Sequence, residues 1–248
     1  MNAAAHNVLV TGGSTGIGLA IAAAFLKQGS RVAVCGRNPG TLASAAAIYP
    51  GLRTWPCDLR HGEELRRLVQ RAAEEFGGLS VLVNNAGIQL NYDFTMEPTD
   101  AILEHIDTEV DTNLTALAKL TALSIPLLKQ ADDAAIVNVS SGLALVPKRS
   151  APIYCATKAA VHSFSKSLRW QMEDSGLPIR VFELLPPMVD TAMTEGRGKG
   201  KIPPEQVASA LLAGMRRDQG EIRVGKVRML APLSRFFPRL AERILRDA

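Results

Sequence analysis

The sequence has little of what marks a membrane-spanning, disulfide-bonded or metal-binding protein. Its apolar runs are all shorter than the roughly 20 residues that a bilayer-spanning helix needs. Cysteine occurs only as Cys35, Cys57 and Cys155, and no pair has the C-x-x-C spacing of a zinc or redox motif. The four histidines are scattered without ligand spacing. We therefore expect no membrane span, no disulfide framework and no metal site.

The N-terminus also lacks the basic segment of a secretory signal. Residues 1–13, MNAAAHNVLVTGG, lead directly into a glycine-rich turn, so we expect no signal peptide and a cytoplasmic protein. The chain does contain enough apolar material for a core, since 47% of its 248 residues are hydrophobic and 21% are charged. A single α/β domain commonly reaches this length, so we expect one domain over residues 1–248.

Positive charge is in excess, but only at one end of the chain. The formal net charge is +4. Residues 197–248 hold 12 Lys and Arg against 5 Asp and Glu, whereas residues 1–196 hold 16 basic and 19 acidic side chains. A basic last fifth suggests an anionic small molecule, a membrane surface or nucleic acid as partner. Because the body of the chain is slightly acidic, nucleic acid is the least favoured of the three.

Short apolar runs alternate with longer helical patterns along the chain. This alternation predicts parallel strands joined by right-handed crossovers. We therefore expect an α/β fold, a single doubly wound Rossmann-type domain of about seven parallel strands with helices on both faces. The expected strands are 8–10, 31–35, 54–57, 80–83, 135–139 and 179–184, with a last extended piece at 221–224 and 226–230. The expected helices are 17–28, 63–76, 100–129, 151–174 and 203–216.

A glycine-rich turn, TGGSTGIG, follows the first expected strand at residues 11–18. Glycines let the backbone approach a pyrophosphate, and the N-terminus of the following helix offers free N–H groups and the positive end of a dipole. The turn is therefore a dinucleotide site in outline. Its spacing is not GxGxxG and it lacks the lysine of a P-loop, so an ordinary tight turn before a helix is the alternative.

Tyr154 and Lys158 lie four positions apart on an expected helix and so share one face. A free tyrosine has a pKa near ~10, and a neighbouring ammonium lowers it, which produces a general acid/base for neutral pH. Ser141 stands earlier, at a strand end, where its hydroxyl could hold a substrate oxygen. The alternatives are an accidental pair on a surface helix and a serine that bonds its own turn.

Together these motifs resemble the short-chain dehydrogenase/reductase family. The resemblance rests on TGGSTGIG, Cys57-Asp58-Leu59, Asn84-Asn85-Ala86-Gly87, Asn113, Ser141 and YCATK, in the right order over about residues 7–192. The stretches GIQLNYDF, SSGLALVP, YCATKAAVHSFSKSLR and ELLPPMVDT are more narrowly similar to the DltE-like oxidoreductases of that family.

The resemblance implies a role for each matching residue. Tyr154 matches the acid/base, and Lys158 the residue that lowers its pKa and binds the nicotinamide ribose. Ser141 matches the residue that orients the substrate oxygen, and Asn113 the residue that holds a water in a proton relay. The implied cofactor-binding residues are Gly12, Ser14, Thr15, Gly16, Ile17, Gly18, Arg37, Asp58, Leu59, Asn85, Ala86, Gly87, Tyr154, Lys158, Pro186, Val189 and Thr191. For Asn85, Ala86 and Gly87, a structural role in the sheet is an equal alternative.

Residues 36 and 37 decide the expected cofactor. Gly36 stands where NAD-selective members of the family have Asp, and Arg37 follows with a fixed charge and a planar fork that suit a 2′-phosphate. We predict NADP(H) in preference to NAD(H); the alternative is a solvated surface arginine. The chain departs from many relatives at Pro186-Pro187, where they have Pro-Gly, because a second proline removes a backbone donor and stiffens the turn.

The substrate is expected between the loops that follow Gly87, Ser141 and Pro187. Residues 191–204 form a Gly- and Pro-containing segment that we expect to be a mobile substrate loop. The expected apolar lining is Leu90, Gly142, Leu143, Val146 and Met188. Positive charge at the mouth is expected from Lys148, Arg149 and residues 197–201. These features suggest a hydrophobic carbonyl compound or alcohol, with an anionic group as a further hypothesis.

The C-terminal segment, residues 232–248, is basic and amphipathic. Its apolar side chains Phe236, Phe237, Leu240 and Ile244 fall toward one side, and four arginines fall largely on another. Such a segment could lie on an acidic membrane surface or cover a partner. The alternative is a helix packed on its own fold, with Pro238 at or near its start.

These observations predict an NADP(H)-dependent oxidoreductase that transfers hydride between nicotinamide and a carbonyl/alcohol substrate. The resemblance further implies a homodimer or homotetramer. The rival hypothesis is a catalytically idle NADP(H)-binding protein that senses the cofactor or regulates a partner. The complete set of Asn113, Ser141, Tyr154 and Lys158 speaks against it, because an idle protein need not keep all four.

Overall fold

The computed structural model describes residues 5–247. Residues 1–4 and residue 248 lie outside the described residues. The former belong to the N-terminal segment in which we expect no signal peptide, and the latter ends the basic C-terminal segment. Among residues 5–247, no helix is long and apolar enough to cross a membrane.

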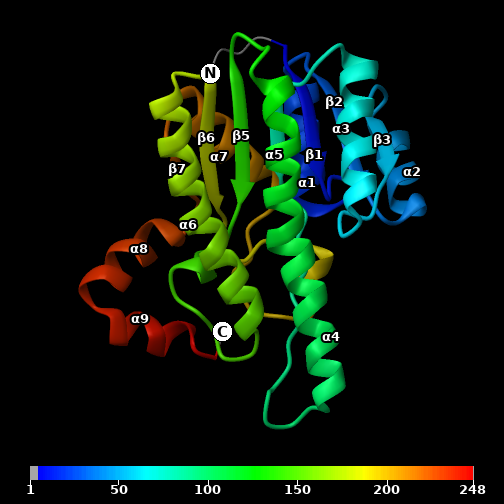
Figure 1. Cartoon of the computed structure of the whole chain (residues 1–248). Helices are drawn as coiled ribbons and strands as arrows, with labels where there is room; N and C mark the ends of the chain where they lie inside the picture. Colours follow the sequence, from blue (N-terminus) through cyan, green and yellow to red (C-terminus); the bar gives the residue numbers. More distant parts are fainter. Residues whose placement is uncertain (1–4, 248) are drawn as a thin grey trace.

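Seven parallel strands form one sheet in the order β3-β2-β1-β4-β5-β6-β7 (Figure 1). The strands are β1 (Asn7–Thr11), β2 (Arg31–Gly36), β3 (Arg53–Pro56), β4 (Val81–Asn84), β5 (Ala134–Val139), β6 (Ile179–Leu185) and β7 (Glu221–Arg223). Every residue of β4 and β5 is buried, as expected for central strands that are covered on both faces. The predicted doubly wound parallel fold is confirmed.

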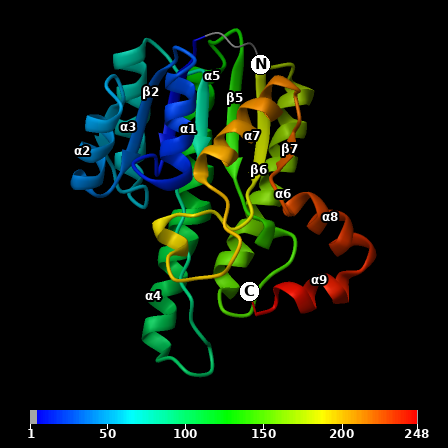
Figure 2. The same ribbon diagram turned by 180° about the vertical axis from the view of Figure 1, so that it is seen from behind.

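Helices cover both faces of the sheet (Figures 1 and 2). On one face, α1 (Gly16–Leu26), α2 (Pro39–Ile48) and α7 (Pro204–Arg216) share a core with the strands. On the other, α3 (Gly62–Phe76), α5 (Ala116–Leu128) and α6 (Pro152–Ser175) do the same. The strand order reverses between β1 and β4, and the carboxyl ends at such a reversal are where open α/β sheets bind ligands.

Three further helices lie beyond the carboxyl ends of the strands. They are α4 (Thr99–Val110), α8 (Val227–Phe236) and α9 (Pro238–Leu245). Figure 1 shows α4 projecting below the sheet on one side, with α8 and α9 on the other. The carboxyl ends of the strands are therefore enclosed between these helices and the neighbouring loops.

Two expectations about elements need correction. Residues 226–230 are not extended, because Val227 begins α8 and packs on the turn at Gly142, where an added Cβ would lie 3.0 Å from Val227 Cγ2. The long helix expected over 100–129 is interrupted by one π turn, Asp111–Thr115, between α4 and α5. Pro238 does begin a helix, as predicted, at the first position of α9.

Candidate functional site

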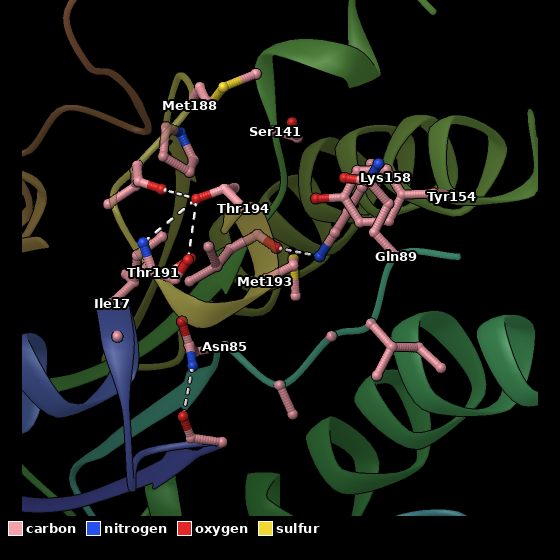
Figure 3. A pocket seen from close by; sticks show the side chains of 18 of the residues that line it. Ile17, Asn85, Gln89, Ser141, Tyr154, Lys158, Met188, Thr191, Met193 and Thr194 are labelled. Atoms are coloured by element: carbon pink, nitrogen blue, oxygen red, sulfur yellow. Dashed lines mark hydrogen bonds between the residues drawn. The ribbon is translucent and has the colours of Figure 1, made fainter. Parts of the chain in front are cut away.

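One cavity of about 700 Å³ opens at the carboxyl edge of the sheet. Every residue predicted for the site lines this cavity, except Gly18 and Asn113. The cavity extends from the glycine turn after β1, past Arg37 and Asp58, to Ser141, Tyr154 and Lys158. Figure 3 shows part of this cavity, with Ile17 and Asn85 on one side and Tyr154 and Lys158 on the other.

The glycine turn and the Asn85–Gly87 segment hold one another in place. Asn85 Nδ2 donates hydrogen bonds to the carbonyl oxygens of Thr11 and Gly12, both at 3.0 Å. The Thr11 hydroxyl accepts from the backbone N–H groups of Asn85 and Ala86, also at 3.0 Å. The Asn-Asn-Ala-Gly motif therefore fixes the turn, which is the structural role that the sequence left as an alternative to direct cofactor contact.

Gly18 shows why the turn needs its glycines. A Cβ at this position would lie 2.4 Å from the Gly12 carbonyl oxygen and 2.5 Å from Asn85 Nδ2. Gly12 and Gly16 have positive φ angles of 60° and 55°, which other residues rarely adopt. Thus Gly18 acts behind the cavity, by allowing the helix to approach the turn.

The residues around this turn fit the phosphates of a dinucleotide. The first N–H groups of α1 have no partner within the helix and lie beside the cavity, at Gly16 and Ile17. The first turn of α1 carries no acidic side chain that would repel an anion. The described part of the chain can therefore supply backbone donors and a favourable dipole at this end of the cavity.

Arg37 and Asp58 lie at the far end of the cavity from Tyr154. Asp58 pairs with Arg60 at 2.7 Å, and the hydrogen bond from the Arg60 side chain, with smaller contributions from the charges of Arg60 and Arg37, lowers the pKa of Asp58 to about 2. Arg37 itself makes no ion pair with any described residue and lines the cavity beside Ser14 and Thr41. Its guanidinium is thus available to an anionic ligand.

The candidate reacting groups come from the ends of two neighbouring elements. Ser141 follows β5 and caps the turn Gly142–Ala144, where its Oγ accepts from Leu143 N at 3.1 Å. Tyr154 and Lys158 lie on the first turns of α6. The Lys158 ammonium donates to the Val139 carbonyl at 2.9 Å and lies 5.7 Å from the centre of the Tyr154 ring. The structure therefore brings the half-buried serine and the buried tyrosine and lysine into one corner of the cavity (Figure 3).

Burial dominates the acid/base behaviour of this corner. It raises the pKa of Tyr154 to about 12, against opposing effects of the Ser141 hydroxyl and the charge of Arg197. It lowers the pKa of Lys158 to about 8, against the charge of Glu183. Burial thus outweighs the lowering of the tyrosine pKa that the sequence predicts from Lys158, and the Tyr154 hydroxyl is protonated at pH 7.

Asn113 lies behind the cavity, in the π turn between α4 and α5. Its Oδ1 accepts from Ile88 N at 2.8 Å, and its Nδ2 donates to Ile88 O at 2.9 Å and to Thr157 Oγ1 at 3.2 Å. A Cβ added at Gly87 would lie 3.2 Å from Lys158 Nζ and 3.3 Å from Asn113 Oδ1. The two polar groups therefore face the same small space at Gly87.

Sequence reasoning missed Glu183, a single acid within the apolar strand β6. Its carboxylate is fully buried, accepts a hydrogen bond from Ser140 and lies 2.7 Å from His162 Nδ1. His162, Glu183 and Glu221 form the one group of potential metal ligands found among the described residues. Glu221 is already paired with Arg223 at 2.6 Å. The signal in the sequence was a charged residue in a continuously buried strand, which requires a partner.

The C-terminal helices form a wall of the cavity, which the sequence did not predict. Leu230 of α8 and Ile244 and Leu245 at the end of α9 line it together with Leu143 and Met188. The predicted lining residues Leu90 and Val146 do not.

A backbone hydrogen bond of 2.9 Å from Arg149 N to Arg246 O connects this wall to the loop before α6. The C-terminal segment thus packs on its own fold, although Phe236 and Phe237 remain exposed.

Residues 191–204 are held by their own contacts. Val189 and Ile202 pair as neighbouring backbone segments, and the Thr194 hydroxyl bonds the backbone of Val189 and Thr191 (Figure 3). Gly196, Gly198 and Gly200 all have positive φ angles, so the alternating glycines build a defined succession of turns.

Comparison with known proteins agrees with this geometry. The family model for short chain dehydrogenases matches residues 6–201. The chain is 39% identical over 236 residues to the uncharacterized oxidoreductase DltE of Bacillus subtilis, covering 93% of this chain and 92% of that one. It is 30% identical over 209 residues to an uncharacterized oxidoreductase of Staphylococcus aureus strain MRSA252, covering 82% of this chain and 88% of that one.

Two solved structures have the same fold. A short chain dehydrogenase/reductase from Burkholderia phymatum in complex with NAD has a TM-score of 0.86 at 21% identity, over 97% of this chain and 96% of that one. A short chain dehydrogenase from Burkholderia cenocepacia in complex with NADP has a TM-score of 0.85 at 25% identity, over 99% of each. The chain belongs to the short-chain dehydrogenase/reductase family of oxidoreductases, and within it to the DltE-like group.

Proposed function

We propose that the protein is an NADP(H)-dependent oxidoreductase that interconverts a carbonyl compound and an alcohol. The observation that carries this proposal is the continuity of the cavity from the glycine turn and Arg37 to Ser141, Tyr154 and Lys158. A dinucleotide whose phosphates lie at the N-terminus of α1 would extend along this cavity toward the buried corner. The backbone donors at Gly16 and Ile17, and the Arg37 side chain, would hold it.

When bound, the reduced nicotinamide supplies the hydride for the carbonyl carbon. Tyr154, neutral at pH 7, donates its proton to the carbonyl oxygen, and Ser141 donates a hydrogen bond to that oxygen as negative charge develops. Lys158 stabilises the tyrosinate that remains. Asn113 fixes the loop at Ile88 and, with Lys158, faces the space at Gly87 in which a water would complete a proton path. In the alcohol direction, the same groups act in reverse.

A carbonyl screen that follows NADPH absorbance tests the activity, and Tyr154→Phe tests the assignment. We expect the variant to lose about 10²–10⁴-fold in kcat, the usual contribution of a positioned proton donor. NADPH affinity, measured by fluorescence titration, should stay unchanged because the ring remains. Binding of NADPH without turnover of any carbonyl or alcohol would instead support the idle sensor.

The preference for NADP(H) rests on Arg37, which lines the cavity without a described ion-pair partner, and on the absence of an acid at Gly36. Arg37→Ala should lower kcat/KM for NADPH by about 10–100-fold, the value of a charge-assisted hydrogen bond, and leave NADH unaffected. Gly36→Asp should favour NADH. Equal use of both cofactors by the unaltered protein, with no response to Arg37→Ala, contradicts the preference.

We further propose a homodimer or homotetramer in the cytoplasm that binds a small molecule and no nucleic acid. Leu103 of α4 and Trp170 of α6 expose 54% and 61% of their surfaces, which a contact with a second copy of the chain would cover. Light scattering after size exclusion tests the assembly. Hydrogen exchange with and without NADPH tests the proposed mobility of residues 191–204.

Membrane contact by residues 232–248 is the less favoured proposal, since Ala241 is buried and Leu245 lines the cavity, whereas Ile244 lines the cavity but is 56% exposed. Co-sedimentation with anionic liposomes tests it, with 1–232 protein as comparison. Identical pelleting of the two proteins would reject membrane contact.

A further inference from the structure

Two cationic side chains converge on one amide in the substrate part of the cavity. Lys148 Nζ and Arg197 Nη1 lie 2.9 Å and 3.0 Å from the side-chain oxygen of Gln89, with that amide oriented so that its oxygen faces the two donors. The side-chain amide of Asn91 lies 2.9 Å from the same oxygen. Both cations therefore share one neutral acceptor.

Neither cation has an anionic partner among residues 5–247. Lys148 is only 8% exposed, and burial together with the charge of Arg197 lowers its pKa. The buried acid Glu109 accepts instead from Leu90 N at 2.8 Å and from the Tyr92 hydroxyl at 3.4 Å. Lys148 is therefore a buried cation and Arg197 a half-buried one, and a buried charge is costly unless an anion pairs with it.

The pair lies within reach of the proposed reacting groups. Lys148 and Gln89 line the cavity together with Tyr154, and Lys148 N donates to the thiol of the adjacent Cys155 at 3.4 Å. Arg197 acts on the pKa of Tyr154 through its charge. Gln89 lies two residues after Gly87, where an added Cβ would lie 3.2 Å from Lys158 Nζ. Arg37 and the glycine turn, which we assign to the cofactor, lie at the other end of the cavity.

We propose that Lys148, Arg197 and Gln89 form an anion-binding subsite, and that the substrate is a carbonyl compound or alcohol bearing a carboxylate or similar anionic group. This inference rests on the proposed function for the reaction, but the subsite itself is a binding property. An oxygen of the bound anion would replace the amide oxygen as the acceptor of both cations and hold the carbonyl toward Tyr154 and Ser141.

Arg149 provides a matched control because it is the neighbouring basic residue with a different environment. It is exposed and pairs with Asp247 at 2.9 Å, whereas Lys148 and Arg197 make no ion pair with a described residue. Replacing Arg149 removes one positive charge from the loop that also carries Lys148. A subsite at Lys148 and Arg197 therefore predicts that Arg149→Met is without effect, whereas general attraction by a basic surface predicts similar losses for all three.

Binding is tested first, without turnover. Benzoate and its neutral isostere benzamide are titrated calorimetrically into the protein saturated with NADP⁺. We expect benzoate to bind at least about 10-fold more tightly than benzamide, as charge-assisted hydrogen bonds imply. Lys148→Met and Arg197→Met should each abolish that difference, and Arg149→Met should keep it. Equal binding of the two probes, no detectable benzoate binding, or similar losses in all three variants overturns the subsite.

Turnover then separates the subsite from the reaction. The probes are 4-formylbenzoate and the neutral 4-formylbenzamide, with NADPH. We expect kcat/KM to favour the carboxylate by about 10-fold or more, and to lose that preference in Lys148→Met and Arg197→Met. If neither aldehyde reacts but benzoate binding still depends on the pair, the proposed reaction is wrong and the subsite stands. If both aldehydes react equally in all proteins, the reaction stands and the subsite is wrong.

Discussion

The two halves of the cavity are built in different ways. The half that we propose for the cofactor follows directly from strand ends and is fixed by hydrogen bonds to backbone, such as those of the Asn85 side chain; it is formed by Gly12, Ser14, Thr15, Gly16, Ile17, Arg37, Asp58 and Asn85–Gly87. The substrate half, formed by Gln89, Leu143, Lys148, Met188, Leu230, Ile244 and Leu245, consists of side chains from loops and from the C-terminal helices. The two halves meet at Ser141, Tyr154 and Lys158.

This difference predicts how each half responds to substitution. In the cofactor half, an atom added at Gly12 or Gly18 meets backbone of the turns that follow β4 and β1, so binding and folding should fail together at these two positions. In the substrate half, a truncated side chain changes one wall of the cavity and leaves the sheet alone. A family can therefore vary the substrate half while keeping one mode of cofactor binding.

Gly18→Ala should have the largest effect, because it breaks the cofactor half at its most crowded point. The added Cβ would lie 2.4 Å from a backbone carbonyl oxygen, which cannot rotate away. We expect a loss of about 1–3 kcal/mol or more in the free energy of unfolding, as for other overpacked cores, and at least about 100-fold weaker NADPH binding. Urea unfolding and NADPH titration measure the two effects. Gly62→Ala is the control, since nothing lies within 4 Å of a Cβ there.

Lys158→Met should stabilise the free protein at pH 7 while abolishing activity. Burial lowers the pKa of Lys158 from 10.5 to about 8, so its charged form costs the folded state about 3 kcal/mol. Below pH 8 the lysine is charged in both the folded and the unfolded protein, so the full cost of burying its charge lowers the stability of the folded state. Between pH 8 and 10.5 the unfolded chain binds the extra proton, so this contribution to stability rises with pH.

The difference between the two proteins isolates this group from others that titrate in the same range. Tyr154, whose pKa is raised to about 12, acts in the opposite sense above pH 10, where the unfolded chain loses the phenolic proton first. Urea unfolding at pH 7, 8.5 and 10, without cofactor, should show the advantage of Lys158→Met shrinking as pH rises. A constant difference across this range would show that the lysine is not buried in its charged form.

Gly87→Ala should have a moderate effect at the junction of the halves. Its methyl group would enter the space between Lys158 Nζ and Asn113 Oδ1, at 3.2 Å and 3.3 Å. We expect kcat to fall about 10-fold, a fraction of what proton transfer contributes, with KM and NADPH affinity nearly unchanged. Gly36→Ala, whose Cβ would make only ordinary contact at 3.4 Å, should leave kcat unaltered. A full rate in Gly87→Ala would exclude a proton path through this space.

The cofactor half could be predicted from the sequence because its signals are local. Buried parallel strands are continuously apolar, the glycine turn directly follows one of them, and Tyr154 and Lys158 share a helix face at a fixed spacing. The substrate half could not, because an amphipathic pattern such as residues 233–245 shows which face is apolar but not what that face covers. Lys226–Leu230 was wrongly expected to be extended for the same reason: Val227 is apolar because it packs on Gly142.

The pKa values of Tyr154 and Lys158 could not be predicted from the sequence either, because they depend on burial, which the spacing of the two residues does not reveal.

Leu245→Ala should have the smallest effect and sharpens the comparison most. Leu245 lines the substrate half from the last turn of α9, so its truncation removes part of an apolar wall. We expect KM for an apolar carbonyl to rise about 3–10-fold, in line with the partial loss of one leucine contact, and NADPH affinity and unfolding to stay unchanged. Leu240→Ala on the same helix is the control, because Leu240 is 49% exposed and lies outside the cavity. If Leu245→Ala weakened NADPH binding as much as it raised KM, the two halves would not be separable, and the C-terminal helices would belong to the cofactor site as well.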